Sequence, residues 1–369
     1  MHVRISTRRH QANVHNRLRL RQSLACALGA LALGAVPLTA LACATCGCTL
    51  STDAATGYSS QSGWRVNLEY DYIDQDELRG GGSIASPEQV VNQPSDPLLD
   101  GGEIEKRTTN RYLNLSVGYR PNAVWGFTLV VPEVQRDHTT YGVQTQPFTS
   151  AEVAPDQISG TNVSGLGDIR LVASYQGFLP THNLGVQLGV KLPTGNYGGE
   201  TDDGLIVGSP VLFKNGPGLG QALDTSLQAG NGSSDLIVGA YYFQAVSQNF
   251  DAFVNGQFEA SVSQRMDAPG ANYRPGNQVT MSAGLRYEAH PDWVPQLQIN
   301  LLHKSADQGA FADATDTAGN VAYLSPGITV SLRKNLQVYA FAQLPVYSQL
   351  SGYQLFPRWT ASVGISTAF

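Results

Sequence analysis

Apolar and polar residues alternate along most of the chain, in segments of about ten residues that are separated by Gly, Pro, Asn and Asp. In the first segment, Val66 and Leu68 alternate with the polar residues Asn67 and Glu69. Alternation with a period of two puts the apolar side chains of a β-strand on one face and the polar ones on the other. The pattern therefore predicts an all-β protein with twelve strands, at residues 64–73, 111–119, 124–136, 168–178, 184–192, 235–244, 251–263, 279–289, 293–303, 321–333, 336–347 and 358–369.

The last segment carries an aromatic residue at each end, Trp359 and Phe369, ten positions apart. A tilted strand that crosses a membrane needs about 9 to 11 residues, and aromatic residues flank the apolar band of membrane barrels. We therefore interpret Trp359 and Phe369 as anchors at the two faces of a bilayer and as the signal for the barrel-assembly machinery. The alternative is an edge strand of a soluble β-protein.

The connections between the segments alternate in length along the whole chain. Outer-membrane barrels of bacteria have an even number of strands, short periplasmic turns and long outer loops. This pattern predicts a twelve-stranded antiparallel transmembrane β-barrel of the outer membrane over residues 63–369, with both termini in the periplasm. The longest link, residues 193–234, is expected to fold partly inward. The short turns are 120–123, 179–183, 247–249, 290–292 and 333–335, and the long links are 74–103, 139–167, 193–234, 264–277, 304–320 and 348–357.

The N-terminal stretch indicates export. Six arginines precede an apolar run at residues 24–38, and Ala40-Leu41-Ala42 provides the small residues of a cleavage site. The apolar run is too short to span a bilayer, so residues 1–42 are predicted to be a signal peptide. Its removal takes away six of the 23 basic residues and none of the 29 acidic ones, which leaves 17 against 29 and a net charge near −12. Such a chain is not suited to bind nucleic acid.

Several phrases in the second half of the chain resemble the putative MetA-pathway of phenol degradation family, whose members are described as transporter-like outer-membrane proteins. The resemblance implies a barrel that passes small, often hydrophobic or aromatic, compounds across the membrane. The phrases are Gly165-Leu166-Gly167-Asp168-Ile169, Lys191-Leu192-Pro193-Thr194-Gly195, Gly232-Ser233-Ser234-Asp235-Leu236, Tyr323-Leu324-Ser325-Pro326-Gly327 and Gln343-Leu344-Pro345-Val346-Tyr347.

Three cysteines, Cys43, Cys46 and Cys48, lie within six residues at the start of the predicted mature chain. Residue 47 is glycine, so the His that follows a covalent haem motif is missing. Three thiols could bind a soft metal such as Cu or Zn or exchange disulfides. A disulfide without further role and a lipid on Cys43 are the alternatives. We expect residues 43–62 to form a periplasmic segment ahead of the first strand.

Charged residues on the polar faces of the strands are expected to line the lumen, because charges facing lipid would cost about 2 to 4 kcal/mol at mid-membrane. Catalysis is not expected, since the four histidines of the mature chain lack the surroundings of a membrane phospholipase. The sequence predicts a channel or transporter for small molecules, surrounded by outer-membrane lipid and lipopolysaccharide. The alternative is a non-conducting barrel whose thiols handle metal or redox partners. The predicted lumen residues are Arg65, Glu69, Asp71, Arg170, Lys191, Glu259, Arg286, Glu288, Arg333 and Arg358.

Overall fold

The computed structural model describes residues 55, 58, 60–91, 104–145, 151–200, 205–265, 272–309 and 312–369. The chain divides into two compact units, Met1–Thr39 and Ala40–Phe369, and the described residues belong to the second. Its elements are β1 (Gly63–Gly81), β2 (Ser83–Ile84), α3 (Pro87–Val91), β3 (Ile104–Arg120), β4 (Trp125–Thr145), β5 (Ala151–Leu166), β6 (Ile169–Tyr175), β7 (Leu184–Leu192), β8 (Gly198–Glu200), β9 (Ile206–Gly208), the 3₁₀ helix η2 (Thr225–Leu227), β10 (Ser233–Ala245), β11 (Phe250–Gln264), β12 (Gln278–Tyr287), β13 (Trp293–Lys304), β14 (Gly319–Arg333) and β15 (Leu336–Ala368).

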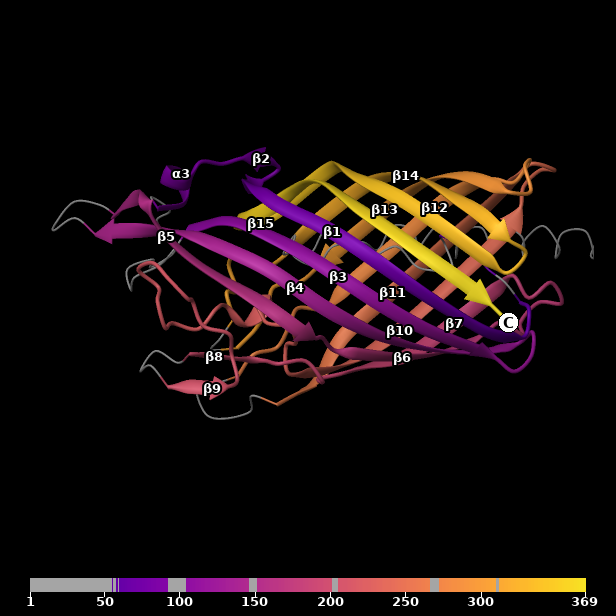
Figure 1. Ribbon diagram of the computed structural model, residues 1–369, viewed down its shortest axis with the longest axis horizontal. Helices are drawn as coiled ribbons and strands as arrows, with labels where there is room; N and C mark the ends of the chain where they lie inside the picture. The colour runs from indigo at the N-terminus through magenta and orange to yellow at the C-terminus, as the bar shows by residue number, and fades with distance from the viewer. Residues whose placement is uncertain are drawn as a thin grey trace, which may run out of the picture. The chain divides into compact units, whose positions relative to one another are not determined.

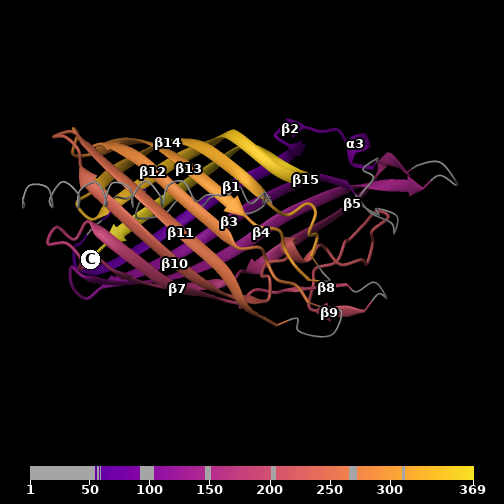
Figure 2. The ribbon, with the colours of Figure 1, turned by 180° about the vertical axis from the view of Figure 1, so that it is seen from behind.

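The strands form a closed antiparallel barrel (Figures 1 and 2). Within the described ranges, eleven strands follow one another in the order β15-β14-β13-β12-β11-β10-β7-β6-β4-β3-β1, and β1 pairs with β15 to close the ring. The main chains of Trp64 and Phe369 exchange hydrogen bonds of 3.1 and 2.9 Å at this seam. The predicted all-β antiparallel barrel is confirmed. Two strands, β2 and β5, pair with β1 and β4 outside the closed ring.

The last strand makes two different pairings along its length. Residues 336–350 pair with β14, and residues 350–368 pair with β1. The sequence had predicted a link at 348–357 between two strands, but the structure continues as β-strand through these residues.

Other predicted links also contain strands. The link predicted at 139–167 contains β5, and β1 continues eight residues past its predicted end at Ile73, to Gly81. The ladder continues there because backbone pairing does not require an apolar outer face: on β4, Glu133, Gln135 and Asp137 follow the apolar outward positions. None of the helices in the described ranges is long and apolar enough to cross a membrane.

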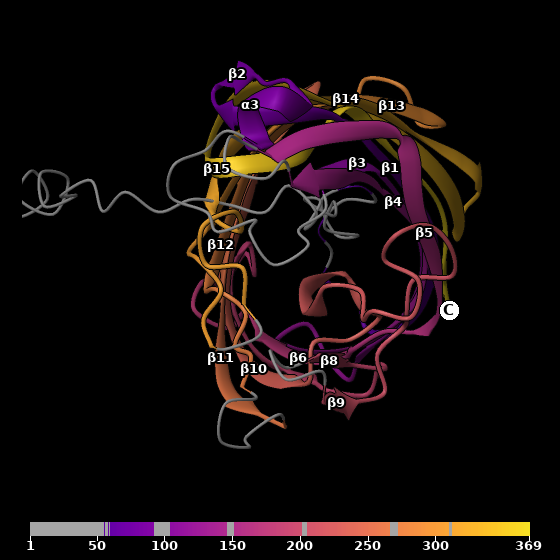
Figure 3. The same ribbon diagram turned by 90° about the vertical axis from the view of Figure 1, so that its left-hand side faces the viewer.

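The two faces of the wall differ in polarity as predicted. On β7, outward Leu188 is 60% exposed, whereas inward Lys191 is 4% exposed. Two aromatic pairs lie at the end of the apolar outer belt where the turns are short. The ring centroids of Trp64 and Tyr119 are 4.5 Å apart, and those of Trp125 and Tyr175 are 4.9 Å apart. At the opposite end, Tyr72 and Trp359 lie 5.7 Å apart. Figure 3 shows the barrel viewed along its axis, from the end at which the long connections lie.

Candidate functional site

A cavity of about 450 Å³ lies inside the barrel. Its walls carry inward side chains from β1, β3, β4, β6, β7, β10, β11, β12 and β13, and residues 226–231 of the link between β7 and β10 complete the lining. Amides and hydroxyls predominate among the uncharged polar groups, with tyrosines beside them. The uncharged polar and aromatic lining includes Tyr58, Tyr112, Asn114, Ser116, Gln187, Tyr241, Asn255, Gln257, Tyr273, Gln278, Thr280 and Ser282.

At the end with the long connections, the described residues of the link between β7 and β10, 193–200 and 205–232, lie over the cavity, and we call them the lid loop. Its residues 226–231 line the same cavity as the strands, which agrees with the expectation that this link folds partly inward. The guanidinium of Arg136 holds it there: it donates to the carbonyl oxygens of Leu227 and, at 3.3 Å, Gln228. The same group donates to Tyr112 Oη at 2.9 Å and to Asn110 Oδ1. Arg136 is 5% exposed, and its charge is satisfied by neutral oxygen atoms.

A small apolar core fastens the lid loop to β5. Phe213, Leu223 and Leu227 pack against Val163, and all four side chains are buried. The backbone of the loop also extends the sheet, because the N–H of residue 214 donates to Gly160 O at 2.9 Å. The loop is therefore a folded part of the wall, which its Gly- and Pro-rich sequence did not reveal.

Two residues that precede β1, Ala55 and Tyr58, lie inside the barrel toward the end with the short turns. Ala55 is buried, and its carbonyl oxygen accepts hydrogen bonds from Arg286 (2.9 Å), Gln296 (2.8 Å) and Thr329 (2.7 Å). Tyr58 accepts a hydrogen bond of 2.7 Å from Asn255. The segment 43–62 was expected in the periplasm, but these two of its residues lie inside the barrel.

Inward aromatic side chains surround Tyr58 and Ala55. The Tyr58 ring lies 5.0 Å from Tyr241 and 5.8 Å from Phe253. Four inward rings of this region each cover a glycine, and a Cβ on that glycine would come within 2.0 to 2.6 Å of the ring. The glycines leave the space that a large ring needs inside a narrow barrel. The pairs are Tyr241 with Gly185, Phe253 with Gly284, Phe341 with Gly327 and Tyr339 with Gly364.

Most of the charges in the cavity are paired, whereas Arg136 and Glu69 hydrogen-bond to neutral groups. Arg170 lies 3.1 Å from Glu259 across the lumen face of the sheet, and Lys191 lies 2.5 Å from Asp235. Lys304, which sequence reasoning did not select, is buried 2.7 Å from Asp307. These pairs fix charged side chains on the lumen face of the wall.

The structure places most of the predicted lumen residues on the inward face. Glu69, Asp71, Lys191 and Arg286 are buried, and Arg170 and Glu259 form an ion pair on the lumen face of the wall. Glu69 accepts a hydrogen bond of 2.6 Å from Tyr339. Arg65 is half-buried on the same face of β1, and Glu288 pairs with Arg286 at 2.8 Å just beyond the end of β12. The role of these residues in selectivity stays a prediction.

The prediction that Arg358 and Arg333 line the lumen is wrong. Arg358 points outward, with 63% of its side chain exposed, and lies 3.2 Å from Asp76 on the outer surface. The register between β1 and β15 shifts next to this position, which displaces Arg358 from the simple alternation. Arg333 is exposed at the short turn between β14 and β15. The predicted metal or redox residues Cys43, Cys46 and Cys48 lie outside the described residues.

Two titratable groups beyond the apolar belt have displaced pKa values. Burial raises the pKa of Glu105 on β3 to about 7, and its carboxylate accepts the backbone N–H of Leu355 at 3.3 Å. Burial, helped by the charge of Arg136, lowers the pKa of His138 to about 3. The His138 ring lies 2.7 Å from Thr108 Oγ1 and 6.0 Å from Phe213 of the lid loop. His138 is therefore a neutral packing residue under the loop at ordinary pH.

A comparison with models of protein families identifies the family of this chain. The model of the family described as putative MetA-pathway of phenol degradation matches residues 107–350. The chain belongs to this family. No curated relative matches the sequence.

Solved structures are similar to this chain at low sequence identity, and the first of those named here, with a TM-score above 0.5, shows the barrel fold. An outer-membrane channel from Pseudomonas putida F1 is 13% identical, with a TM-score of 0.56, over 87% of this chain and 100% of that one. The CymD monoaromatic hydrocarbon channel is 13% identical with a TM-score of 0.42 over 87% and 93%. The Ralstonia pickettii toluene transporter TbuX is 11% identical with a TM-score of 0.43 over 84% and 90%.

Proposed function

We propose that this protein is an outer-membrane channel that passes small uncharged molecules through the chamber inside its barrel. The observation that carries the proposal is the polar cavity inside a barrel whose outer wall is apolar. A polar lumen within an apolar belt is the arrangement of outer-membrane barrels that conduct solutes.

The charge balance of the chamber supports an uncharged solute. Four basic and four acidic residues line it among those described, so their formal charges sum to zero. A balanced set of charges, six of them in ion pairs, gives no strong field to attract one sign of ion. The tyrosines and amides between them can contact rings and hydrogen-bond to hydroxyl groups. The family description, which refers to phenol degradation, agrees with a small aromatic solute. The eight charged residues are Glu69, Arg136, Asp168, Arg170, Lys191, Asp235, Glu259 and Lys304.

We infer twelve membrane crossings and periplasmic termini. The two pairings of β15 correspond to two crossings joined near residue 350, which raises the eleven closed strands to twelve. An even number agrees with single-chain bacterial barrels, and their short turns lie on the periplasmic side. In this orientation the lid loop faces the outside and Tyr58 faces the periplasm. Trp359 and Phe369 are 48% and 70% exposed, as contacts with lipid or with the assembly machinery require.

Recordings in planar bilayers and swelling of liposomes test the proposal. We expect small current steps with a reversal potential near zero in a salt gradient, because the lumen charges balance. Swelling should be faster with phenol-sized neutral solutes than with sugars. Replacing Tyr58 with Ala should increase both signals, since it removes a large ring from the inside of the barrel. A protein that stays silent in both assays, with Tyr58→Ala equally silent, would refute the channel.

A further inference from the structure

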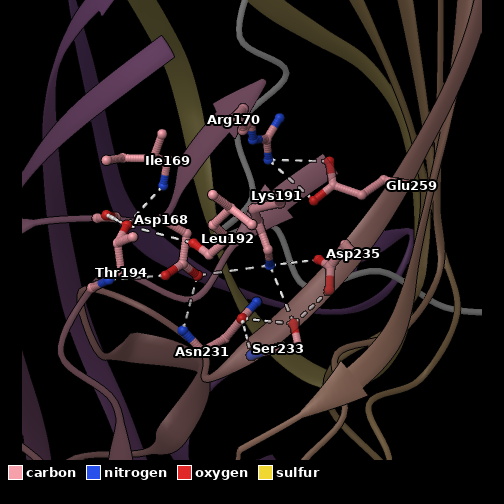
Figure 4. A network of polar contacts seen from close by, with 12 residues as sticks. Asp168, Ile169, Arg170, Lys191, Leu192, Thr194, Asn231, Ser233, Asp235 and Glu259 are labelled. Carbon is pink, nitrogen blue, oxygen red and sulfur yellow. Dashed lines mark hydrogen bonds and ion pairs between the residues drawn. The ribbon is translucent and has the colours of Figure 1, made fainter. Parts of the chain in front are cut away.

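Three phrases that are far apart in the sequence meet in one buried network at the outer ends of β6, β7 and β10 (Figure 4). The first contributes Asp168, the second Lys191 and Thr194, and the third Ser233 and Asp235. They are the first three phrases by which the chain resembles its family. The lid loop starts from the second phrase and ends at the third.

The carboxylate of Asp168 joins the two ends of the lid loop. Its Oδ1 accepts the N–H of Gly195 at 3.0 Å, and its Oδ2 accepts the N–H of Asn231 at 3.2 Å. Thr194 adds a second attachment, because its hydroxyl donates to Gly167 O at 2.8 Å and accepts from Ile169 N at 2.9 Å. One side chain of the wall thus holds the residues at which the loop leaves the barrel and returns to it.

A lysine compensates the charge of this carboxylate. Lys191 Nζ lies 3.7 Å from Asp168 and 2.5 Å from Asp235, and it donates to Ser233 Oγ at 3.3 Å. The side chains of the three charged residues are each at most 9% exposed. Two carboxylates share this one ammonium group, so the loss of Lys191 would leave two buried negative charges without a partner, which is costly.

The two ends of the lid loop are also in direct backbone contact, at Gly195 and Gly230. A Cβ on Gly230 would lie 2.6 Å from Asp168 Oδ1 and 2.8 Å from Gly195 Cα. A side chain at position 230 would therefore force the carboxylate and the two backbones apart. The clamp depends on this close approach as well as on charge.

We propose that Asp168, Lys191 and Asp235 form a clamp that holds the lid loop over the outer end of the chamber, and that Asp168 sets how often the loop opens. Asp168 is a positioning residue, which acts on solute passage through the loop. The inference rests on the proposed function only where it concerns solute passage. The clamping of the loop stands independently.

The test measures loop opening separately from transport. Ser116 lines the chamber below the loop, so Ser116→Cys, with Cys43, Cys46 and Cys48 replaced by Ser, reports access through its rate of labelling by a small charged thiol reagent. Asp168→Asn keeps the shape but replaces one carboxylate oxygen by an NH₂ group, which cannot accept the N–H of Gly195 or Asn231, and we expect labelling to become about tenfold faster, a change of about 1.4 kcal/mol. Asp74→Asn is the matched control, because Asp74 pairs with Arg107 at 2.5 Å on the outer surface and should leave the rate unchanged.

A second variant keeps the test decisive if Asp168→Asn does not fold. Gly230→Ala leaves every charge in place and should accelerate labelling by separating the loop ends. Heat-dependent migration on gels verifies that each variant is a folded barrel. Labelling of the folded variants at the wild-type rate overturns the clamp. Faster labelling without faster solute flux supports the clamp and refutes the proposed transport instead.

Discussion

Arg136 offers the sharpest test of the outer closure. We expect Arg136→Met, which keeps the length of the side chain and removes its donors, to release η2 from the wall. The carbonyl oxygens of Leu227 and Gln228 then lose a charged donor in a buried place. Hydrogen bonds to charged groups contribute about 1.5 to 3 kcal/mol each. Two of them give a loss of about 3 kcal/mol or more in the local stability of the loop, which is about a hundredfold in its opening constant.

Amide hydrogen exchange followed by mass spectrometry measures this opening. The N–H of Leu223 donates to Val211 O at 2.9 Å and the N–H of Leu227 to Asp224 O at 3.0 Å, so peptides covering 211–228 report directly on the loop. Exchange in these peptides should accelerate about a hundredfold in Arg136→Met. Peptides from β13 should exchange as in the wild type, because Arg136 does not touch this strand.

Arg111→Met provides the matched control. Arg111 lies on the neighbouring strand β3, pairs with Asp137 at 2.6 Å and faces outward. Its loss should leave the loop peptides unchanged, since exposed ion pairs contribute about 0 to 1 kcal/mol. If Arg136→Met forms a folded barrel whose loop exchanges at the wild-type rate, the reasoning that Arg136 fastens the loop is refuted.

Three further predictions address the wall, the outer rim and the N-terminal thiols. Leu188→Arg should lower the free energy of unfolding in lipid vesicles by about 2 to 4 kcal/mol, whereas Gln187→Arg on the lumen face should cost less; equal losses would contradict the assignment of the two faces. The raised pKa of Glu105, about 7 against an ordinary 4.5, means that the folded state holds its proton more tightly than the unfolded state. Stability should therefore be greatest below pH 4.5 and fall as the pH rises to 7, by at most about 3 kcal/mol, and Glu105→Gln should remove this part of the dependence in unfolding measured between pH 4 and 8. Replacing Cys43, Cys46 and Cys48 with Ser should abolish the binding of Cu or Zn by the purified mature protein; metal content equal to that of the unmodified protein would exclude these thiols as the ligands.

Sequence reasoning was most successful where a local pattern has a direct structural consequence. Alternation with a period of two decides which side chains share a face, so Leu188 and Lys191 could be assigned to opposite sides of one strand before the structure was known. It failed where the rule of an apolar outer face no longer applies. Beyond the belt, β4 continues with polar outward residues such as Asp137, and β5 follows in a stretch predicted as a link. Arg358 was misplaced because a shift in register interrupts the alternation.

The sequence by itself therefore determined the barrel, its apolar outer belt and the polar character of its lumen, because each follows from residues next to one another on a strand. Only the tertiary structure decided what lies inside the lumen. Arg136 reaches a carbonyl 91 positions away, and Arg286 reaches Ala55 across 231 positions. The alternation says that a side chain points inward but not which group it meets there, since that depends on how distant strands are brought together by the curvature of the sheet.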